Sequence, residues 1–159
     1  MEMPKRKDLR LSNYDYSSNG AYYVTICTHN QVHLFGKVNP ETGTILYNEA
    51  GKMVLQWLHS IPNKYSSVSL DCCVVLPNHI HFILFLDGSE YTLGDIIKWF
   101  KAQSTNEYIR GVKQNRFPPF DKAIWQRNYY EHIVHSENEL NQIRQYITYN
   151  SLKWNIVRE

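Results

Sequence analysis

An apolar run from Val74 to Phe85 contains two histidines, His79 and His81, one residue apart and directly after Pro77-Asn78. Side chains alternate between the two faces of a β-strand. If a strand begins at about His79, both imidazoles leave the same side of it, and the intervening apolar residues face the other side. Paired imidazoles on one face of a rigid strand could hold a divalent metal ion.

The spacing of apolar residues and turn signals along the chain predicts a succession of short strands and longer helices. The expected strands lie at 21–28, 68–76 and 79–86, with a hairpin at 36–46 and short extended segments at 124–126 and 129–134. The first expected helix runs from Asn48 and stops before Pro62, and the second is capped by Thr92, with Asp95 in a capping-box-like start, and gives way to a loop at 111–119. The third runs from Glu137 to about Lys153 and begins with a capping box formed by Ser136 and Glu139.

This order, β-α-β-β-α-β followed by one more helix, is the ferredoxin-like plan. It is an α+β fold in which an antiparallel sheet carries two helices on one face. The opposite face of the sheet must be covered or put to use. The extra C-terminal helix is the natural element to lie there, across from the two histidines.

At 159 residues the chain is expected to form one domain, residues 1–159, large enough to bury a core without staples. Residues 1–19 are expected to be a polar N-terminal arm. No apolar stretch approaches the roughly 20 residues needed to cross a bilayer, and neither a membrane span nor a secretory leader is expected. The three cysteines, Cys27, Cys72 and Cys73, favour reduced thiols in a cytoplasm over a disulfide framework or a zinc cluster.

The net charge of +2 is too small by itself to indicate a nucleic-acid partner, but the charge is unevenly distributed. Between Asp95 and Arg127 there are seven basic residues against three acidic ones, and the N-terminal arm adds four more bases. Solvated helix faces carry similar charge, so this pattern alone does not decide between the two explanations. The seven are Lys98, Lys101, Arg110, Lys113, Arg116, Lys122 and Arg127.

A second chemical pattern lies in the expected C-terminal helix, where Tyr146 and Asn150 stand four residues apart and share one face. A phenol ordinarily has a pKa of about 10, so it needs a nearby cation, base or metal to become a nucleophile. Two imidazoles and an amide oxygen would leave open positions on a metal ion for phosphate oxygens. The combination indicates a metal-assisted tyrosine nucleophile. Tyr149 is a competing tyrosine, but it lies off the helix face that Tyr146 shares with Asn150. For each of the candidate residues taken alone, a structural role such as core packing is the alternative explanation.

Five parts of the chain, taken together, match one known family. They are Leu9-Arg10-Leu11 with Tyr14-Asp15-Tyr16, then 20–28, Leu76-Pro77-Asn78-His79-Ile80-His81, 125–132, and Tyr146-Ile147-Thr148-Tyr149-Asn150. On these segments the chain resembles the REP-associated tyrosine transposases, members of the HUH superfamily of single-strand DNA endonucleases that are related to the transposases of small insertion sequences. Two positions depart from the family pattern, because Ser151 stands where relatives often have proline and His135 replaces a frequent arginine.

The resemblance implies that His79, His81 and Asn150 bind Mg²⁺ or Mn²⁺, and that Tyr146 attacks a phosphate of single-stranded DNA. The products would be a 5′-phosphotyrosine and a free 3′-hydroxyl, and the substrate would contain hairpin-forming or palindromic repeats. His132 and His135 are expected to lie outside the ligand set. Contacts with DNA are predicted for Lys98, Lys101, Arg116, Gln126, Arg127 and Tyr129, with Tyr130 a second aromatic that could stack on bases.

Three interpretations remain open from the sequence. The first is a transposase-like enzyme that cleaves and rejoins single-stranded DNA. The second is a domesticated single-stranded nucleic-acid-binding module that keeps the fold without cleavage. The third assigns the same chemistry to replication initiation, which the family-like N-terminal segment disfavours, though only through the resemblance. A monomer and a homodimer that exchanges the tyrosine helix are both compatible with the sequence.

Overall fold

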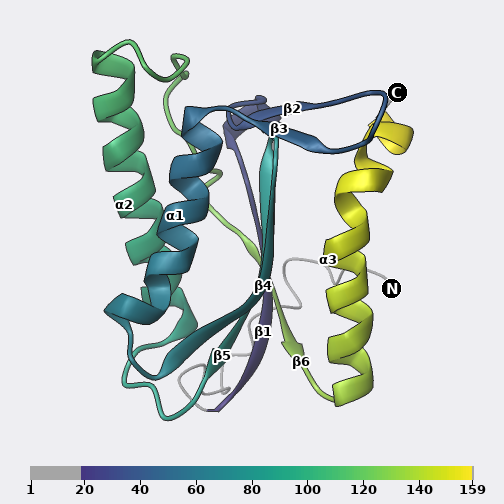
Figure 1. Ribbon diagram of the computed structural model, residues 1–159. Helices are drawn as coiled ribbons and strands as arrows, with labels where there is room; N and C mark the ends of the chain where they lie inside the picture. Colours follow the sequence, from purple (N-terminus) through teal and green to yellow (C-terminus); the bar gives the residue numbers. More distant parts are fainter. Residues whose placement is uncertain (1–18, 159) are drawn as a thin grey trace.

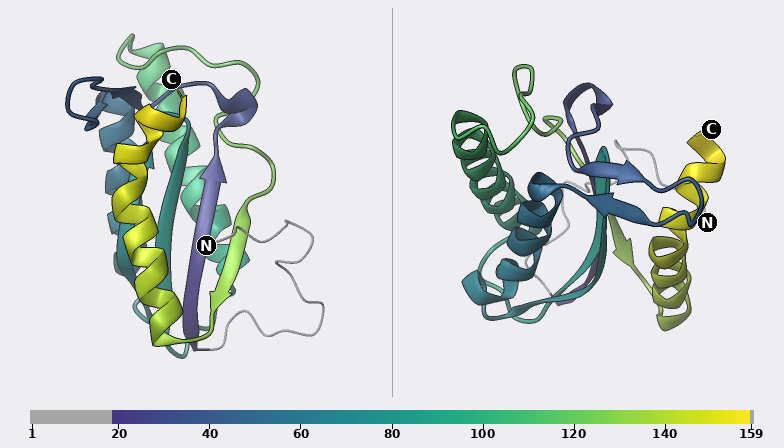
Figure 2. Two further views of the ribbon diagram at one scale, coloured as in Figure 1. Left: turned by 90° about the vertical axis from the view of Figure 1, so that its right-hand side faces the viewer. Right: turned by 45° about the horizontal axis from the view of Figure 1, so that its top comes forward.

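A four-stranded antiparallel sheet organises the chain. A computed structural model describes residues 19–158, with side chains described through residue 149. Helices α1 (Glu49–Lys64) and α2 (Leu93–Lys113) cover one face of the sheet, and α3 (Glu137–Arg158) runs along the opposite face (Figure 1 and Figure 2). The strand order is β4 (Val68–Leu76), β5 (His79–Leu86), β1 (Gly20–Cys27) and β6 (Tyr130–Val134). This arrangement confirms the predicted ferredoxin-like α+β fold with an extra C-terminal helix.

The segments that match the family before Gly20, including Tyr14-Asp15-Tyr16, lie outside the described residues, as does nearly all of the expected N-terminal arm. The predicted hairpin at 36–46 is confirmed by β2 (Gly36–Val38) and β3 (Ile45–Tyr47), which form a separate two-stranded sheet. Gly36 has a φ of 145°, and a side chain there would collide with the carbonyl oxygen of Leu46. The close approach of the two strands therefore requires glycine at this position.

Alternation along β5 divides its residues between two cores. Ile80, Phe82 and Leu84 face α1 and α2 and join the larger hydrophobic cluster. His79, His81 and Ile83 face α3, because successive side chains of a strand point to opposite faces. The two neighbouring cysteines of β4 are divided in the same way, with Cys72 packed against the smaller cluster and Cys73 against the larger one. Neither Cys72 nor Cys73 forms a disulfide within the described residues.

The predicted end of the first helix is wrong, because α1 continues through Pro62 to Lys64. Proline lacks the N–H that would bond to the carbonyl four residues earlier, so a helix interior normally excludes it. Here Pro62 stands in the last turn, and Ile61 beside it is fully buried in the larger core. The burial of Ile61 favours continuing the helix for one more turn, and the N–H of Tyr65 still donates to the carbonyl of Ile61.

The predicted start of α2 is confirmed, but its predicted end is not. Thr92 accepts from the backbone N–H of Asp95, and the Asp95 side chain accepts from the backbone N–H of Thr92, which completes the capping box. The helix continues to Lys113 rather than giving way to a loop at Gly111. The loop after it folds back so closely that a side chain on Gly111 would collide with the ring of Phe117. Glycine there lets the loop pack on the helix.

The start of α3 differs from the predicted capping box in one detail. The backbone N–H of Glu139 donates to Ser136 Oγ, as expected. The Glu139 carboxylate, however, accepts from the backbone N–H of His135 and contacts His132 instead of closing the box on Ser136. The helix also extends to Arg158, beyond the predicted end near Lys153. Of the two predicted extended segments, 129–134 contains β6, whereas 124–126 forms only a bridge between Thr28 and Trp125.

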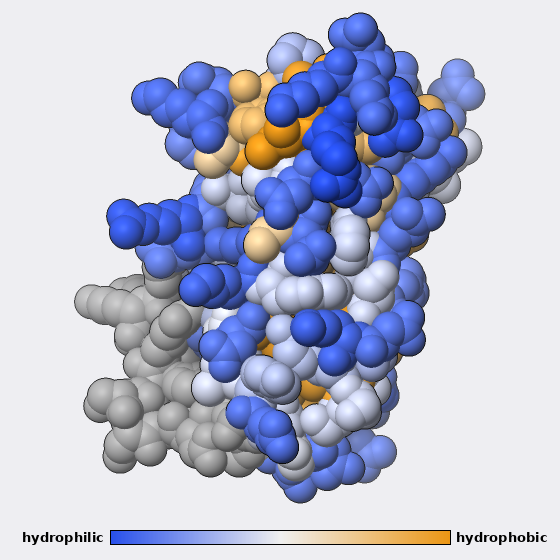
Figure 3. Space-filling view, turned by 90° about the vertical axis from the view of Figure 1, so that its left-hand side faces the viewer, coloured by the Kyte–Doolittle hydropathy of each residue, from blue (hydrophilic) through white to orange (hydrophobic). Residues whose placement is uncertain are grey.

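The outer surface of the α1–α2 layer is largely hydrophilic, as expected for helices that bury one face (Figure 3). Within residues 19–158, no helix is both long enough and apolar enough to cross a membrane.

Candidate active site

His81 lies on the α3 side of the sheet and is almost completely buried. It faces Thr25 across the β1–β5 pair, and its Nδ1 lies 2.8 Å from Thr25 Oγ1 and 3.0 Å from Tyr23 Oη. Burial, and to a smaller extent the neighbouring His79, lower the pKa of His81 well below its usual value. The imidazole is therefore neutral at physiological pH, which is the form that binds metal ions.

His79 lies beside it at the start of β5, with the two ring centroids 4.8 Å apart and the rings nearly perpendicular. Its Nδ1 lies 2.7 Å from Asn78 Oδ1, while Asn78 Nδ2 donates to the carbonyl oxygen of Gln31. Because a carbonyl oxygen only accepts, Nδ1 of His79 must carry the hydrogen. This tautomer puts the lone pair on Nε2, the arrangement in which a histidine ligand is oriented by a second residue.

Tyr146 reaches this pair from α3 within the same chain. Its ring centroid lies 5.8 Å from that of His81 and 6.5 Å from that of Tyr23. Ile143 and Ile147, the buried residues on either side of Tyr146, hold the helix against the sheet. The structure thus brings the predicted nucleophile to one of the predicted ligands without the need for a second subunit.

The two other tyrosines near this site are poorer candidates. Tyr149 is 51% exposed, which agrees with its position off the face shared by Tyr146 and Asn150. Tyr23 is buried beneath Tyr146, and burial raises the pKa of its hydroxyl well above the usual range. A buried neutral phenol can bond to His81 but is hard for a substrate to reach.

The third predicted ligand, Asn150, belongs to α3 one turn beyond Tyr146, but its side chain lies outside the described residues. Among the described side chains, no group of three or more His, Cys, Asp or Glu residues is arranged to hold a metal ion.

Two polar contacts hold α3 in place. Arg144 donates from Nε and Nη2 to the two carboxylate oxygens of Asp71 on β4, at 2.8 and 2.7 Å, and these bonds lower the pKa of Asp71. At the start of the helix, partial burial would raise the pKa of Glu139. The backbone N–H of His135 and the side chain of His132 outweigh that effect, so the pKa is lowered. His132 and His135 are thus engaged with the helix start.

Three residues around the histidine pair were not predicted: Tyr23, Thr25 and Asn78. Thr25 lies opposite His81 on β1, and Tyr23 is two residues earlier on the same strand face, so this spacing is a usable signal once the β1–β5 register is known. Asn78 is adjacent to His79, and its amide could have been read as a partner that fixes the ring.

The predicted DNA-contact residues fall into two groups. Lys101, Gln126 and Arg127 line one surface hollow between α2 and the 120–127 segment, and Lys122 lines it with them. Lys98 is exposed on α2 three residues before Lys101, and Arg116 is exposed in the loop after that helix. The first group, with Lys122, therefore lines one basic hollow.

Tyr129 is buried in the larger core with 9% of its surface exposed, and Lys101 Nζ lies 5.5 Å from its ring centroid. So little exposed ring leaves scant surface for stacking on a base. Tyr130 is half-buried and pairs with Thr25 on the histidine side of the sheet, so it is better placed for that role.

The site combines two imidazoles, of which His81 is kept neutral by burial, with a half-buried phenol that is held by a docked helix. Such an arrangement can bind a divalent cation, orient a phosphodiester and present an oxygen nucleophile to it. The basic hollow on the α2 side adds cations that can contact neighbouring phosphates.

Comparison with known sequences gives one family match and two close relatives. Residues 31–150 match the family model described as "Transposase IS200 like". The chain is 33% identical to a Haemophilus influenzae protein described as uncharacterized, over 94% of this chain and 89% of that protein. It is 26% identical to a second Haemophilus influenzae protein, provisionally named as a REP-associated tyrosine transposase, over 90% of this chain and 77% of the other.

Two solved structures share the fold. One is a REP-associated tyrosine transposase bound to a REP hairpin, with a TM-score of 0.61 and 18% identity over 90% of this chain and 74% of that one. The other is a provisionally identified transposase from Deinococcus radiodurans R1, with a TM-score of 0.56 and 19% identity over 87% of this chain and 95% of that one. At these identities the likeness concerns the fold.

Proposed function

Because the chain belongs to the IS200-like transposase family, we propose that it is a strand-transfer enzyme that cleaves and rejoins single-stranded DNA at hairpin-forming repeats. Tyr146 would be the nucleophile, and the intermediate would be a covalent 5′-phosphotyrosine. The observation that carries this proposal is the packing of the Tyr146 ring against His81 within one chain. Family membership supports a transposase-like role in DNA processing, and the geometry supports the choice of tyrosine.

His79, His81 and Asn150 would hold Mg²⁺ or Mn²⁺. The two imidazoles fit that role, because His81 is kept neutral by burial and His79 is oriented by Asn78. The hydroxyls of Thr25 and Tyr23 can each accept from Nδ1–H of His81, in the tautomer that leaves Nε2 for a ligand. When bound, such an ion would supply Lewis-acid activation and orientation of the phosphodiester.

The reaction would exchange one ester bond for another. Tyr146 Oη forms a bond to phosphorus and loses its proton, while the bond from phosphorus to the 3′ oxygen breaks and that oxygen is protonated. The energy of the broken linkage stays in the phosphotyrosine. A 3′-hydroxyl of a second DNA end can then attack it in reverse, so rejoining needs no ATP.

The proposed substrate is DNA with hairpin or palindromic repeats. A solved protein of the same fold is bound to a REP hairpin, which supports this choice. The hollow lined by Lys101, Lys122 and Arg127 offers cations to a DNA backbone. We further propose that residues 1–159 form a single HUH domain, and that one protomer suffices for cleavage because Tyr146 and His81 meet within it.

Covalent trapping tests the proposal. Wild-type protein incubated with Mn²⁺ and end-labelled hairpin DNA is expected to give an adduct that migrates with the protein on a denaturing gel. Tyr146→Phe should abolish the adduct, because it removes only the attacking oxygen. Tyr149→Phe, the matched control on the exposed side of the helix, should form it at the wild-type level.

An equal yield from Tyr146→Phe and wild type would refute the assignment of the nucleophile. Tight hairpin binding with no adduct under any metal would instead identify a binding module that does not cleave.

A further inference from the structure

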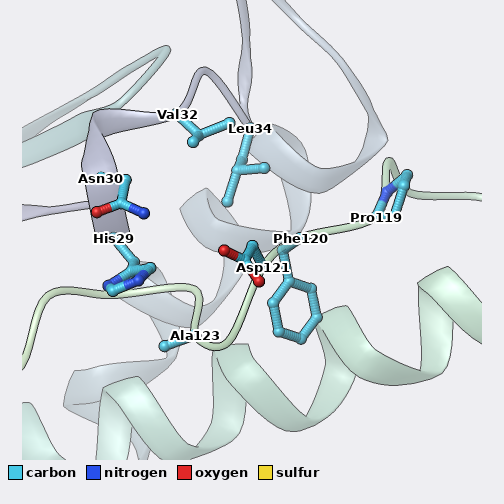
Figure 4. Close-up of a pocket in the computed structure, with 8 residues that line it drawn as sticks. All are labelled: His29, Asn30, Val32, Leu34, Pro119, Phe120, Asp121 and Ala123. Carbon is cyan, nitrogen blue, oxygen red and sulfur yellow. The ribbon is translucent and has the colours of Figure 1, made fainter.

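A pocket of about 330 Å³ opens between the turn that follows β1 and segment 119–123 (Figure 4). Its walls are mainly apolar and include Val32, Leu34 and Phe120. In Figure 4, Asp121 lies between the His29–Asn30 turn and the ring of Phe120. The pocket therefore combines apolar and aromatic surface with a polar edge. Proteins bind unpaired nucleobases with these two elements, stacking on the base and hydrogen bonding to its edge.

The pocket adjoins the candidate active site through β1. Cys27, the last residue of that strand, pairs with His79. His29 follows two residues later, at most about 7 Å of extended backbone away. The backbone N–H of His29 donates to the carbonyl of Ile124, and the N–H of Gln126 donates to that of Cys27. These hydrogen bonds connect the pocket to β1, the strand that pairs with the histidine-bearing strand β5.

The basic hollow continues from the pocket, since the two share Phe120 and Ala123. Lys101 Nζ donates to the backbone carbonyls of Gln126 and Arg127, at 2.8 and 3.1 Å, which fixes this segment against α2. Lys122 and Arg127 are exposed, so their charges are accessible to phosphates. Single-stranded DNA exposes both unpaired bases and phosphates. The pocket can receive a base, and the neighbouring cations can contact the phosphates.

The loops around the pocket also adopt an unusual backbone conformation. Within the described residues, four positions other than glycine have positive φ angles. One of them, Asn30, lines the pocket, and two more, Gln31 and Lys122, are next in the chain to residues that line it. Asn30 and Gln31 have φ angles of 56° and 55°, and Lys122 has 69°. Non-glycine residues in this region cost energy and are found preferentially at ligand-binding and catalytic sites.

We propose that this pocket receives one unpaired guanine of the DNA substrate and that the Asp121 carboxylate binds the guanine edge. The inference rests on the proposed function and adds a site of sequence recognition to it. Guanine presents two donors side by side, N1–H and the 2-amino group, which match the two oxygens of a carboxylate. Cytosine and adenine place a ring acceptor next to their amino group, and thymine has one donor between two carbonyls, so a carboxylate discriminates against all three.

Binding of modified hairpins tests the pocket directly. The probe is a fluorescein-labelled DNA hairpin with an oligothymidine flank in which a single guanine is walked from position to position. Fluorescence anisotropy with the full chain should find one position at which guanine improves affinity about tenfold over thymine. Inosine at that position, which lacks the 2-amino group, should lose most of the gain. 7-Deazaguanine, which keeps both donors, should retain it.

Asp121→Asn should abolish the guanine preference, because an amide cannot accept two hydrogen bonds side by side. Asp87→Asn, the same change at an exposed carboxylate just after β5, is the matched control and should leave the preference intact. Ala123→Phe, which fills the pocket from its wall, is a second variant and should also remove the preference. Thermal melting and circular dichroism of each variant check that it is folded.

A wild-type protein that binds all positions equally, or a guanine preference that survives in folded Asp121→Asn, would overturn the nucleobase pocket. Adduct formation by Tyr146 is measured separately, so the two proposals can fail independently. A guanine preference without any adduct overturns the cleavage proposal and supports the pocket. Adduct formation with no base preference does the reverse, and a chain that binds no DNA overturns both.

Discussion

The two faces of the sheet are built differently. The face covered by α1 and α2 buries a continuous hydrophobic core to which helices, strands and the 117–129 segment all contribute. The face covered by α3 buries a much smaller apolar cluster and, beside it, several polar side chains. That cluster is Ala21, Tyr23, Ile83, Ile143 and Ile147. The adjacent polar residues are Thr25 and His81, which are buried, and His79, which is half-buried.

This difference shows how one set of strands can provide both stability and chemistry. In β5, Ile80 and Phe82 belong to the larger core while His79 and His81 point to α3. Burying polar groups opposes folding unless they are hydrogen-bonded. The lowered pKa of His81 is a direct sign of that opposition. The larger core must therefore supply most of the folding free energy, and the α3 face can be organised around the imidazoles.

The largest expected effect on stability comes from the α1–α2 face. Leu58 on α1 is fully buried in the larger core, on the opposite face of the sheet from the histidine pair. Leu58→Ala is expected to lower the free energy of unfolding by about 4 kcal/mol, from lost burial and the cavity left behind. Urea denaturation measures this loss. Adduct formation per folded molecule, assayed well below the melting temperature, should remain close to wild type.

A smaller loss of stability with a larger loss of activity is expected from Ile143→Ala on the α3 face. Ile143 is fully buried between α3 and the sheet, three residues before Tyr146. We expect about 2 kcal/mol in the free energy of unfolding, because α3 covers a small cluster and can readjust. Hydrogen exchange should show faster opening of α3 than of α1. If Leu58→Ala impairs cleavage more than Ile143→Ala does, the division of roles between the faces is wrong.

The sequence was most informative where local rules decide the structure. Period-two alternation placed His79 and His81 on one face, and the Thr92–Asp95 capping box marked the start of α2. Pro62 was misread because the tertiary burial of Ile61 outweighs one missing hydrogen bond in the last turn of a helix. Local propensity cannot anticipate that balance.

The surroundings of the histidines depended on information that one strand does not contain. Thr25 and Tyr23 reach His81 only because β1 pairs with β5 in a particular register. The pocket near Asp121 arises from two loops far apart in the chain that pack together. Neither loop has a sequence pattern that specifies its conformation, so the pocket could not be predicted.

Thr25→Val separates the chemical role of the α3 face from its packing. Valine has nearly the same shape as threonine, but it removes the hydroxyl that lies 2.8 Å from His81 Nδ1. Loss of a residue that orients a metal-binding histidine typically reduces metal affinity 10- to 100-fold. We expect about a tenfold weaker apparent affinity for Mn²⁺, measured by titrating adduct yield against metal concentration.

The thermal stability of Thr25→Val should change little. Thr42→Val, at an exposed position between β2 and β3, is the matched control, and an equal shift there would remove the special role of Thr25.

The smallest expected effect concerns the ion pair that ties α3 to β4. Hydrogen bonds from Arg144 lower the pKa of Asp71, so the folded protein resists protonating this carboxylate more than the unfolded chain does. The contribution of the pair is therefore fully present above the ordinary carboxyl pKa near 3.8 and is lost as the pH falls through the lower folded value. Because 39% of the Arg144 side chain is exposed, solvent screening keeps the effect small. Asp71→Asn should lower the urea midpoint at neutral pH, and the difference from wild type should shrink in strong acid.

Asp87→Asn, the control at an exposed carboxylate, should show no such pH-dependent difference. A gap between Asp71→Asn and wild type that stays constant down to strong acid would mean that Asp71 stabilises α3 through packing and not through its charge.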